Sequence, residues 1–127
     1  HPLLVRQIIT NLLSNAIKYN RNGGSIRFSI MNIPESRTVR FEISDTGVGI
    51  PTSEQIRVFE RFFRGTNVQK ESTEGTGLGL YLVKSLVDLS GGDIGFNSTE
   101  GGGTMFWFTL PLEISQKRGG MEQNVLS

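Results

Sequence analysis

The chain contains no cysteine and only one histidine, and none of its apolar runs approaches the ~20 residues that cross a membrane. The missing cysteines exclude disulfide bonds, thiolate chemistry and cysteine-based metal sites, and a single histidine excludes a histidine cluster. Excess charge is also absent, because 13 Lys and Arg residues balance 12 Asp and Glu residues to a formal net charge of +1. We therefore expect no nucleic-acid partner and no direct membrane contact, and cytoplasmic residence fits this composition.

Glycine, in contrast, is abundant, with 16 among 127 residues, against a usual share of about 7%. Most of these glycines form clusters around Gly47, Gly77, Gly91 and Gly102, between segments with periodic apolar residues. Such clusters are typical of a site built from loops. The length and the 36% hydrophobic content predict one globular domain over residues 1–111. The polar residues 112–127 predict a disordered tail.

Apolar periodicity predicts an α/β two-layer sandwich, in which helices cover one face of a single sheet. An amphipathic helix is expected over residues 3–19, with its apolar face made by Val5, Ile8, Ile9, Leu12, Leu13, Ala16 and Ile17. Asn11 and Asn15 are expected on its opposite, polar face. Strands are predicted near residues 25–30, 39–44, 93–97 and 104–110, a short helix over 51–62 and a longer helix over 78–89.

The run from Gly75 to Leu80 closes a polar loop and begins the last long helix. Alternate glycines allow backbone N–H groups to approach an anion, and the start of a helix favours negative charge. A phosphate-bearing ligand fits this pattern. A flexible hinge before a helix would give the same sequence.

Asp45 follows the phase of Val39, Phe41 and Ile43, so its strand directs the carboxylate toward the apolar side of the sheet. An unpartnered charge is costly there. One interpretation is a turn aspartate that accepts a hydrogen bond from the Gly47 backbone. The other is an acceptor at the floor of a pocket, which would suit the exocyclic amino group of adenine and not the carbonyl of guanine.

Asn11, Asn15 and Lys18 share one side of the first helix. Asparagine is unfavourable within a helix, so two in register suggest a ligand, although a solvated polar face is the simpler interpretation. Amide oxygens suit Mg²⁺, which usually keeps water and phosphate oxygens as further ligands. Lys18 would add a positive charge near the same phosphates.

Together these segments resemble the catalytic, ATP-binding domain of two-component sensor histidine kinases. The resemblance covers about Arg6 to Pro111 and rests on five segments in the order of that family, at residues 11–19, 45–50, 59–64, 75–80 and 103–108. It implies a Bergerat fold, with a mixed sheet of about five strands covered on one face by three helices. Because the family's strand before the first helix is missing, we expect the sheet to lack this edge strand or to use a substitute.

The resemblance also implies site residues. Asn15 would bind Mg²⁺, Arg64 would reach the γ-phosphate of ATP, and Asp45 would bind the adenine amino group. The catalytic set would be Asn11, Asn15, Lys18 and Arg64. The remaining nucleotide-binding residues would be Tyr19, Gly47, Gly49, Ile50, Gly75, Thr76, Gly77, Leu78, Gly79, Leu80 and Thr104.

The implied activity is transfer of the γ-phosphoryl group of ATP to a histidine on a separate dimerisation hairpin, upstream of a response regulator. His1 lacks the acidic neighbour of an acceptor histidine, so we expect it to be a boundary residue. Because the dimerising hairpin is missing, we expect a monomer that binds nucleotide without autophosphorylation. Related ATPases and serine kinases of this fold place a glutamate where this chain has Asn11, and an amide is no general base. Negligible ATP turnover is therefore expected from the chain alone. A non-catalytic nucleotide sensor is the other alternative.

Overall fold

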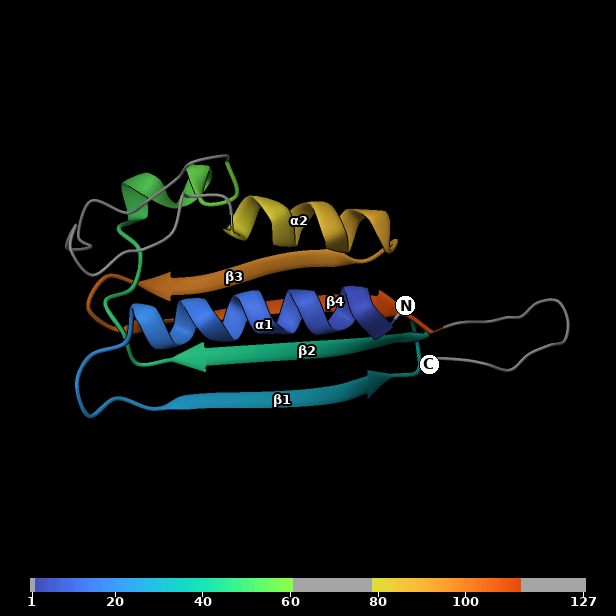
Figure 1. Ribbon diagram of the computed structural model, residues 1–127, viewed down its shortest axis with the longest axis horizontal. Coiled ribbons are helices and arrows are strands. Elements are labelled where there is room, and N and C mark those ends of the chain that lie inside the picture. The colour runs from blue at the N-terminus through green and yellow to red at the C-terminus, as the bar shows by residue number, and fades with distance from the viewer. Residues whose placement is uncertain (1, 61–78, 113–127) are drawn as a thin grey trace, which may run out of the picture.

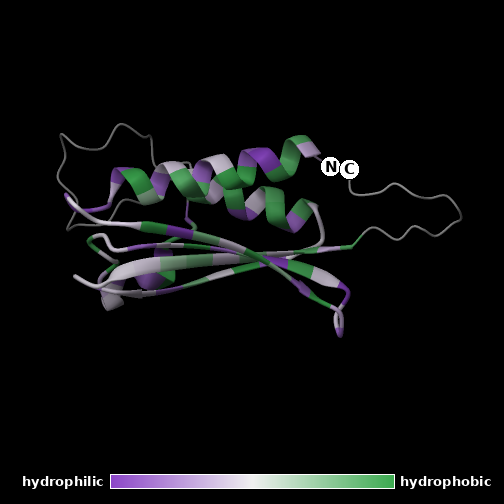
Figure 2. Ribbon diagram, turned by 90° about the horizontal axis from the view of Figure 1, so that it is seen from below, coloured by the Kyte–Doolittle hydropathy of each residue, from purple (hydrophilic) through white to green (hydrophobic). Residues whose placement is uncertain are grey.

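Two α-helices cover one face of a four-stranded sheet in the computed structural model, which describes residues 2–60 and 79–112. Figure 1 shows both helices lying along the strands, and Figure 2 shows them on the same side of the sheet. The predicted two-layer sandwich is confirmed. The elements are α1 (Pro2–Lys18), β1 (Ile26–Ile33), β2 (Thr38–Asp45), the 3-10 helix η1 (Thr52–Arg57), α2 (Gly79–Leu89), β3 (Asp93–Thr99) and β4 (Gly103–Pro111).

The strand order is β1-β2-β4-β3, and every neighbouring pair within the described residues is antiparallel. The expected mixed sheet of about five strands is therefore an antiparallel sheet of four in this part of the chain. The connection through α2 does join two parallel strands, β2 and β3. Because the returning strand β4 lies between them, no two neighbours are parallel.

The core lies between the sheet and the two α-helices. Phe41 of β2 stacks on Phe108 of β4 with ring centroids 4.5 Å apart, and Phe59 packs edge-on against Phe96 and Phe106. Phe59 therefore anchors the segment after η1 in the core. The buried apolar residues are Ile8, Leu12, Ala16, Phe41, Ile43, Val58, Val83, Leu86, Val87, Phe106 and Phe108.

The buried stripe of α1 differs in direction from the one that the helical wheel predicts. Ile8 is 0% exposed, whereas Ile17 is 67% exposed although it was expected on the apolar face. Asn11 and Asn15 are half-buried instead of lying at the centre of the solvent face. The reason is that α1 packs against α2 as well as β2, so the buried direction turns toward α2. No helix within residues 2–60 and 79–112 is long and apolar enough to cross a bilayer.

Strand β1 forms one edge of the sheet and carries exposed apolar residues. Ile26, Phe28 and Ile30 pair with Asp45, Ile43 and Phe41, so they lie on the helix-covered side of the sheet. They are nevertheless 36%, 41% and 56% exposed. None of the described elements covers this row completely.

The exposure of α1 predicts opposite results for two identical substitutions on the same helix. Ile8→Ala should lower the free energy of unfolding by about 2–5 kcal/mol, because it leaves a cavity between α1 and the sheet. Ile17→Ala should change it by less than about 0.5 kcal/mol, since Ile17 is mostly in solvent. Urea denaturation with an unchanged slope measures both values. Equal losses in the two variants would contradict the orientation of α1.

Candidate functional site

Several chain segments that are distant in sequence meet at one end of the sheet. Figure 1 shows the C-terminal ends of α1, β2 and β3 there, together with the start of β4 and the N-terminal end of α2. The antiparallel register places Asp45 of β2 opposite Thr104 of β4, and Thr104 opposite Ser98 of β3. These three polar side chains form a row at this end, on the helix-covered side of the sheet.

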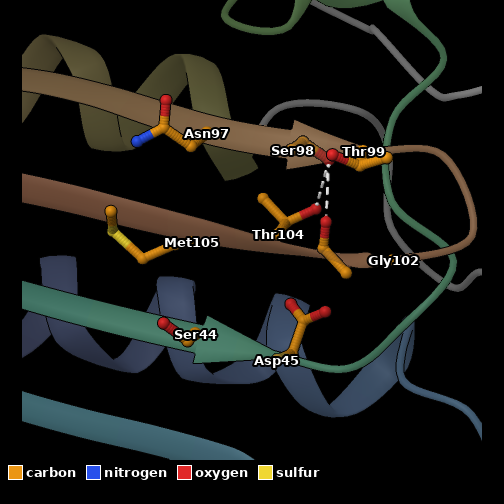
Figure 3. A pocket seen from close by; sticks show the side chains of 9 residues that line it. Ser44, Asp45, Asn97, Ser98, Thr99, Gly102, Thr104 and Met105 are labelled. Carbon is orange, nitrogen blue, oxygen red and sulfur yellow. Dashed lines mark hydrogen bonds between the residues drawn. The ribbon is translucent and has the colours of Figure 1, made fainter.

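Asp45 and Thr104 line an open hollow of about 270 Å³ at the ends of β2, β3 and β4 (Figure 3). Its other lining residues are Ser44, Asn97, Ser98, Thr99, Gly102, Gly103 and Met105. The hollow opens on the face of the sheet that the two α-helices leave free, because four of its lining side chains belong to the opposite strand phase. These are Ser44, Asn97, Thr99 and Met105 (Figure 3). No described residue of α1 lines it.

Asp45 is half-buried, and different parts of its surroundings shift the pKa of its carboxyl group in opposite directions. Its Oδ1 accepts a hydrogen bond from the Gly47 backbone N–H at 2.8 Å. Desolvation raises the pKa of Asp45 above its ordinary 3.8, while backbone hydrogen bonds from Gly47 and Thr104 lower it, with desolvation the largest effect. The turn-aspartate interpretation is thus correct. A carboxylate has about four lone-pair directions, so two backbone bonds still leave acceptor capacity for a ligand.

The turn after β2 packs so closely that glycine is required at two positions. A Cβ on Gly47 would overlap the carbonyl oxygen of Tyr19, and a Cβ on Gly49 would overlap that of Thr99. Gly49 also has a φ of +71°, in the left-handed region that favours glycine. The Val48 N–H donates to the Tyr19 carbonyl at 3.1 Å, which ties this turn to the end of α1. Tyr19, Gly47 and Gly49 therefore meet, as the sequence predicts for one site.

Ile50 links the same turn to β3 through two residues that sequence analysis missed. Its N–H donates to Ser98 Oγ at 2.8 Å. The amide of Gln55 donates to the Ile50 carbonyl at 3.0 Å and to the Ser98 carbonyl at 3.1 Å. Ser98 could have been found by the argument used for Asp45, since it continues the phase of Ile94 and Phe96. Gln55 gives no comparable signal in the sequence.

The α1 amides lie beside the core. Asn11 and Asn15 flank the buried residues Leu12 and Ala16, and Lys18 is half-buried in the last turn. Asn11 Nδ2 is buried and has no hydrogen-bond partner among the described residues. A buried amide without an acceptor is costly, so this atom marks a place for an acceptor that the described part of the chain does not supply.

Part of the predicted site lies outside the described residues, namely Arg64, Gly75, Thr76, Gly77 and Leu78. Gly79 begins α2, and no atom of the described residues lies within 4 Å of a Cβ placed there. Leu80 packs against the core, so it has a structural role whatever it contributes to a ligand.

The sequence matches the family described as histidine kinase-, DNA gyrase B- and HSP90-like ATPases over residues 1–114. Sensor histidine kinase WalK of Bacillus subtilis is 40% identical over 113 residues, which cover 89% of this chain and 18% of WalK. Signal transduction histidine-protein kinase BarA of Escherichia coli is 40% identical over 117 residues, which cover 90% of this chain and 13% of BarA. The chain thus spans less than a fifth of the length of these two relatives.

Solved structures give the same assignment. The mycobacterial sensor histidine kinase MprB superposes with a TM-score of 0.78 at 31% identity, covering 87% of this chain and 74% of that one. Full-length ShkA, solved in complex with AMPPNP, superposes with a TM-score of 0.70 at 35% identity, covering 85% of this chain and 21% of that one. The chain therefore belongs to the histidine kinase-, DNA gyrase B- and HSP90-like ATPase family, and within it to the ATP-binding catalytic domains of sensor histidine kinases.

Proposed function

We propose that this chain binds Mg²⁺-ATP and transfers its γ-phosphoryl group to a histidine on a separate dimerisation domain. The observation that carries the proposal is the half-buried Asp45 carboxylate beside Thr104 on the helix-covered side of the sheet. An acceptor-only group in this position suits the exocyclic amino group of adenine. Full-length ShkA, a structural relative, was solved with AMPPNP, which supports a nucleotide in this fold.

The α1 amides suit the triphosphate end of the same ligand. The buried Asn11 Nδ2 lacks an acceptor, and a phosphate oxygen or a metal-bound water would supply one. Asn15 lies one turn further toward the site end of α1 and offers an amide oxygen, a hard ligand that suits Mg²⁺. Lys18 ends the helix and adds positive charge close by. We assign Asn15 as the metal ligand and Asn11 and Lys18 as phosphate-contacting residues.

The remaining predicted contacts belong to the same proposal. Gly75, Thr76, Gly77, Leu78 and Gly79 would bring backbone N–H groups to the phosphates, and Arg64 would neutralise charge that develops on the γ-phosphate. Phosphoryl transfer forms a P–N bond to a neutral imidazole as the bond to the β-phosphate oxygen breaks. Such transfer depends mainly on positioning and charge neutralisation. Since Asn11 cannot act as a general base, the site favours an acceptor nitrogen that is already nucleophilic over water or serine.

The wider context is also part of the proposal. The partners would be the dimerisation hairpin of the parent protein, which carries the acceptor histidine, and a downstream response regulator. Residues 1–111 would form the domain and residues 112–127 its polar tail. We place the chain in the cytoplasm as a monomer, with no nucleic-acid partner.

Calorimetric titration with ATP and GTP, with and without Mg²⁺, tests the nucleotide assignment. Wild-type protein should prefer ATP, and Mg²⁺ should tighten binding. Asp45→Asn should weaken ATP binding by about 10-fold to 100-fold, the value of a hydrogen bond to a charged group. Asp93→Asn, which removes an exposed carboxylate, is the matched control and should bind normally.

The metal assignment has its own pair of variants in the same titration. Asn15→Ala should lose most of the gain in affinity that Mg²⁺ provides, whereas the exposed neighbour Ser14→Ala should keep it. Equal affinity for ATP and GTP would count against the adenine role of Asp45. An unchanged Mg²⁺ effect in Asn15→Ala would remove that residue from the metal site.

The raised pKa of Asp45 predicts that this residue destabilises the free protein near neutral pH. Because desolvation disfavours the carboxylate, the folded chain keeps its proton to a higher pH than the unfolded chain. Folding stability is therefore lost as the pH rises from 3.8 through the folded pKa. Asp45→Asn should be more stable than wild type at pH 7, and the difference should shrink toward pH 4. Urea denaturation at both pH values measures it, and a less stable variant at pH 7 would contradict the dominance of desolvation.

Phosphoryl transfer is tested with radiolabelled ATP and the dimerisation hairpin of the parent protein. The chain alone should neither label itself nor turn over ATP at a measurable rate. Added hairpin should become labelled, and a hairpin whose acceptor histidine is replaced by glutamine should not. Tight ATP binding without label on the hairpin would favour a nucleotide sensor. Rapid ATP hydrolysis that Asn11→Ala abolishes would favour an ATPase.

A further inference from the structure

In the row of polar side chains at this end of the sheet, Thr104 lies between Asp45 and Ser98. Its hydroxyl oxygen lies 2.8 Å from the Ile50 nitrogen, 3.1 Å from the Gly103 carbonyl oxygen and 2.8 Å from Thr104 Oγ1. The hydrogen bond between Ser98 and Thr104 is drawn in Figure 3. Three polar atoms thus surround a hydroxyl group that has only one hydrogen to donate.

The chemistry of the three neighbours decides where the hydrogens lie. The Ile50 N–H can only donate, so it occupies a lone pair of Ser98 Oγ. The Gly103 carbonyl oxygen can only accept, so it takes the Ser98 hydrogen; otherwise two oxygens would face each other at 3.1 Å with no hydrogen between them. In the remaining pair, Thr104 must then be the donor.

This arrangement determines what Thr104 offers to a ligand. A threonine hydroxyl normally rotates to suit its neighbour and either donates or accepts. Here its hydrogen is directed at Ser98, so only its lone pairs remain for a ligand. The adjacent Asp45 carboxylate is also an acceptor.

We infer that Ser98 is a specificity-determining positioning residue that makes Thr104 accept only, so that the Asp45–Thr104 pair selects a base with an amino group. The inference rests on the proposed nucleotide function. Adenine brings two N–H donors at its exocyclic position. A purine with a carbonyl there would direct lone pairs at two acceptors. If Thr104 were free to rotate, it would donate to that carbonyl and tolerate it.

The Ile50 N–H, which donates to Ser98 Oγ, is held in position by further hydrogen bonds of the same turn. Gln55 donates to the carbonyls of both Ile50 and Ser98, and so keeps the turn after β2 against β3. The Gly101 N–H donates to the Val48 carbonyl at 2.7 Å and ties the same turn to the β3–β4 connection. The Ile50 N–H is therefore held at Ser98 by contacts on both sides of it.

Binding of ATP and inosine triphosphate tests the inference, because inosine carries a carbonyl where adenosine has its amino group and lacks the extra amino group of guanosine. Wild-type protein should prefer ATP. Ser98→Ala releases the Thr104 hydrogen and should reduce the ratio of the two affinities by roughly threefold to tenfold, the value of one neutral hydrogen bond. Ser98→Cys, which is close in size and a weak acceptor, should change the ratio in the same direction if the alanine variant does not fold.

Matched variants separate positioning from a general structural role. Ser98→Thr keeps the hydroxyl and should keep the preference. In a Thr104→Val background, Ser98→Ala should leave the ratio unchanged, because the group through which Ser98 acts is gone. Equal weakening of ATP and inosine triphosphate in Ser98→Ala would overturn the inference and leave the proposed function intact. A wild-type protein that binds neither nucleotide would overturn the proposed function itself.

Discussion

The site depends on the carboxylate of Asp45, which the sheet holds in a half-buried and partly desolvated position. The strand phase that buries Phe41 and Ile43 also directs Asp45 toward the helix side, and desolvation raises its pKa. Two backbone N–H groups compensate in part and orient the carboxylate, leaving it as an acceptor that a ligand can use. Because a partly desolvated charge without a ligand weakens the fold, this position is one where stability and binding oppose each other.

Close backbone packing keeps that carboxylate in place. The turn after β2 touches the end of α1 through Gly47 and the β3–β4 connection through Gly49, and neither contact leaves space for a Cβ. Ser98 and Gln55 then bond this turn to β3. The nucleotide site proposed here is thus supported by two layers of hydrogen bonds, one on Asp45 and one on Thr104, and both involve the same short turn.

Much of the fold was predictable, because apolar periodicity depends on neighbours in sequence. Both α-helices and all four described strands lie close to the expected residues. Asp45 also lies on the expected, helix-covered side of the sheet. The errors share one cause, which is packing between elements that are distant in the sequence. The direction in which α1 buries its side chains is set by α2 as well as the sheet, which leaves Ile17 exposed and turns Asn11 inward. Similarly, the insertion of β4 between β2 and β3 makes this part of the sheet antiparallel, and no local pattern indicates which strands become neighbours.

The amino-acid sequence alone shows which groups are available: an acidic residue in an apolar strand phase, two amides one helical turn apart, and glycines where the backbone must pass closely. These are local properties, since each follows from the spacing of residues along one element. Which of these groups meet depends on how the strands and helices pack together. Asp45, Thr104 and Ser98 come from three strands, and their row exists because hydrogen-bond register aligns positions far apart in the chain. The hydrogen that Thr104 directs at Ser98 has the same origin, because a hydroxyl takes its orientation from the donors and acceptors that folding places around it.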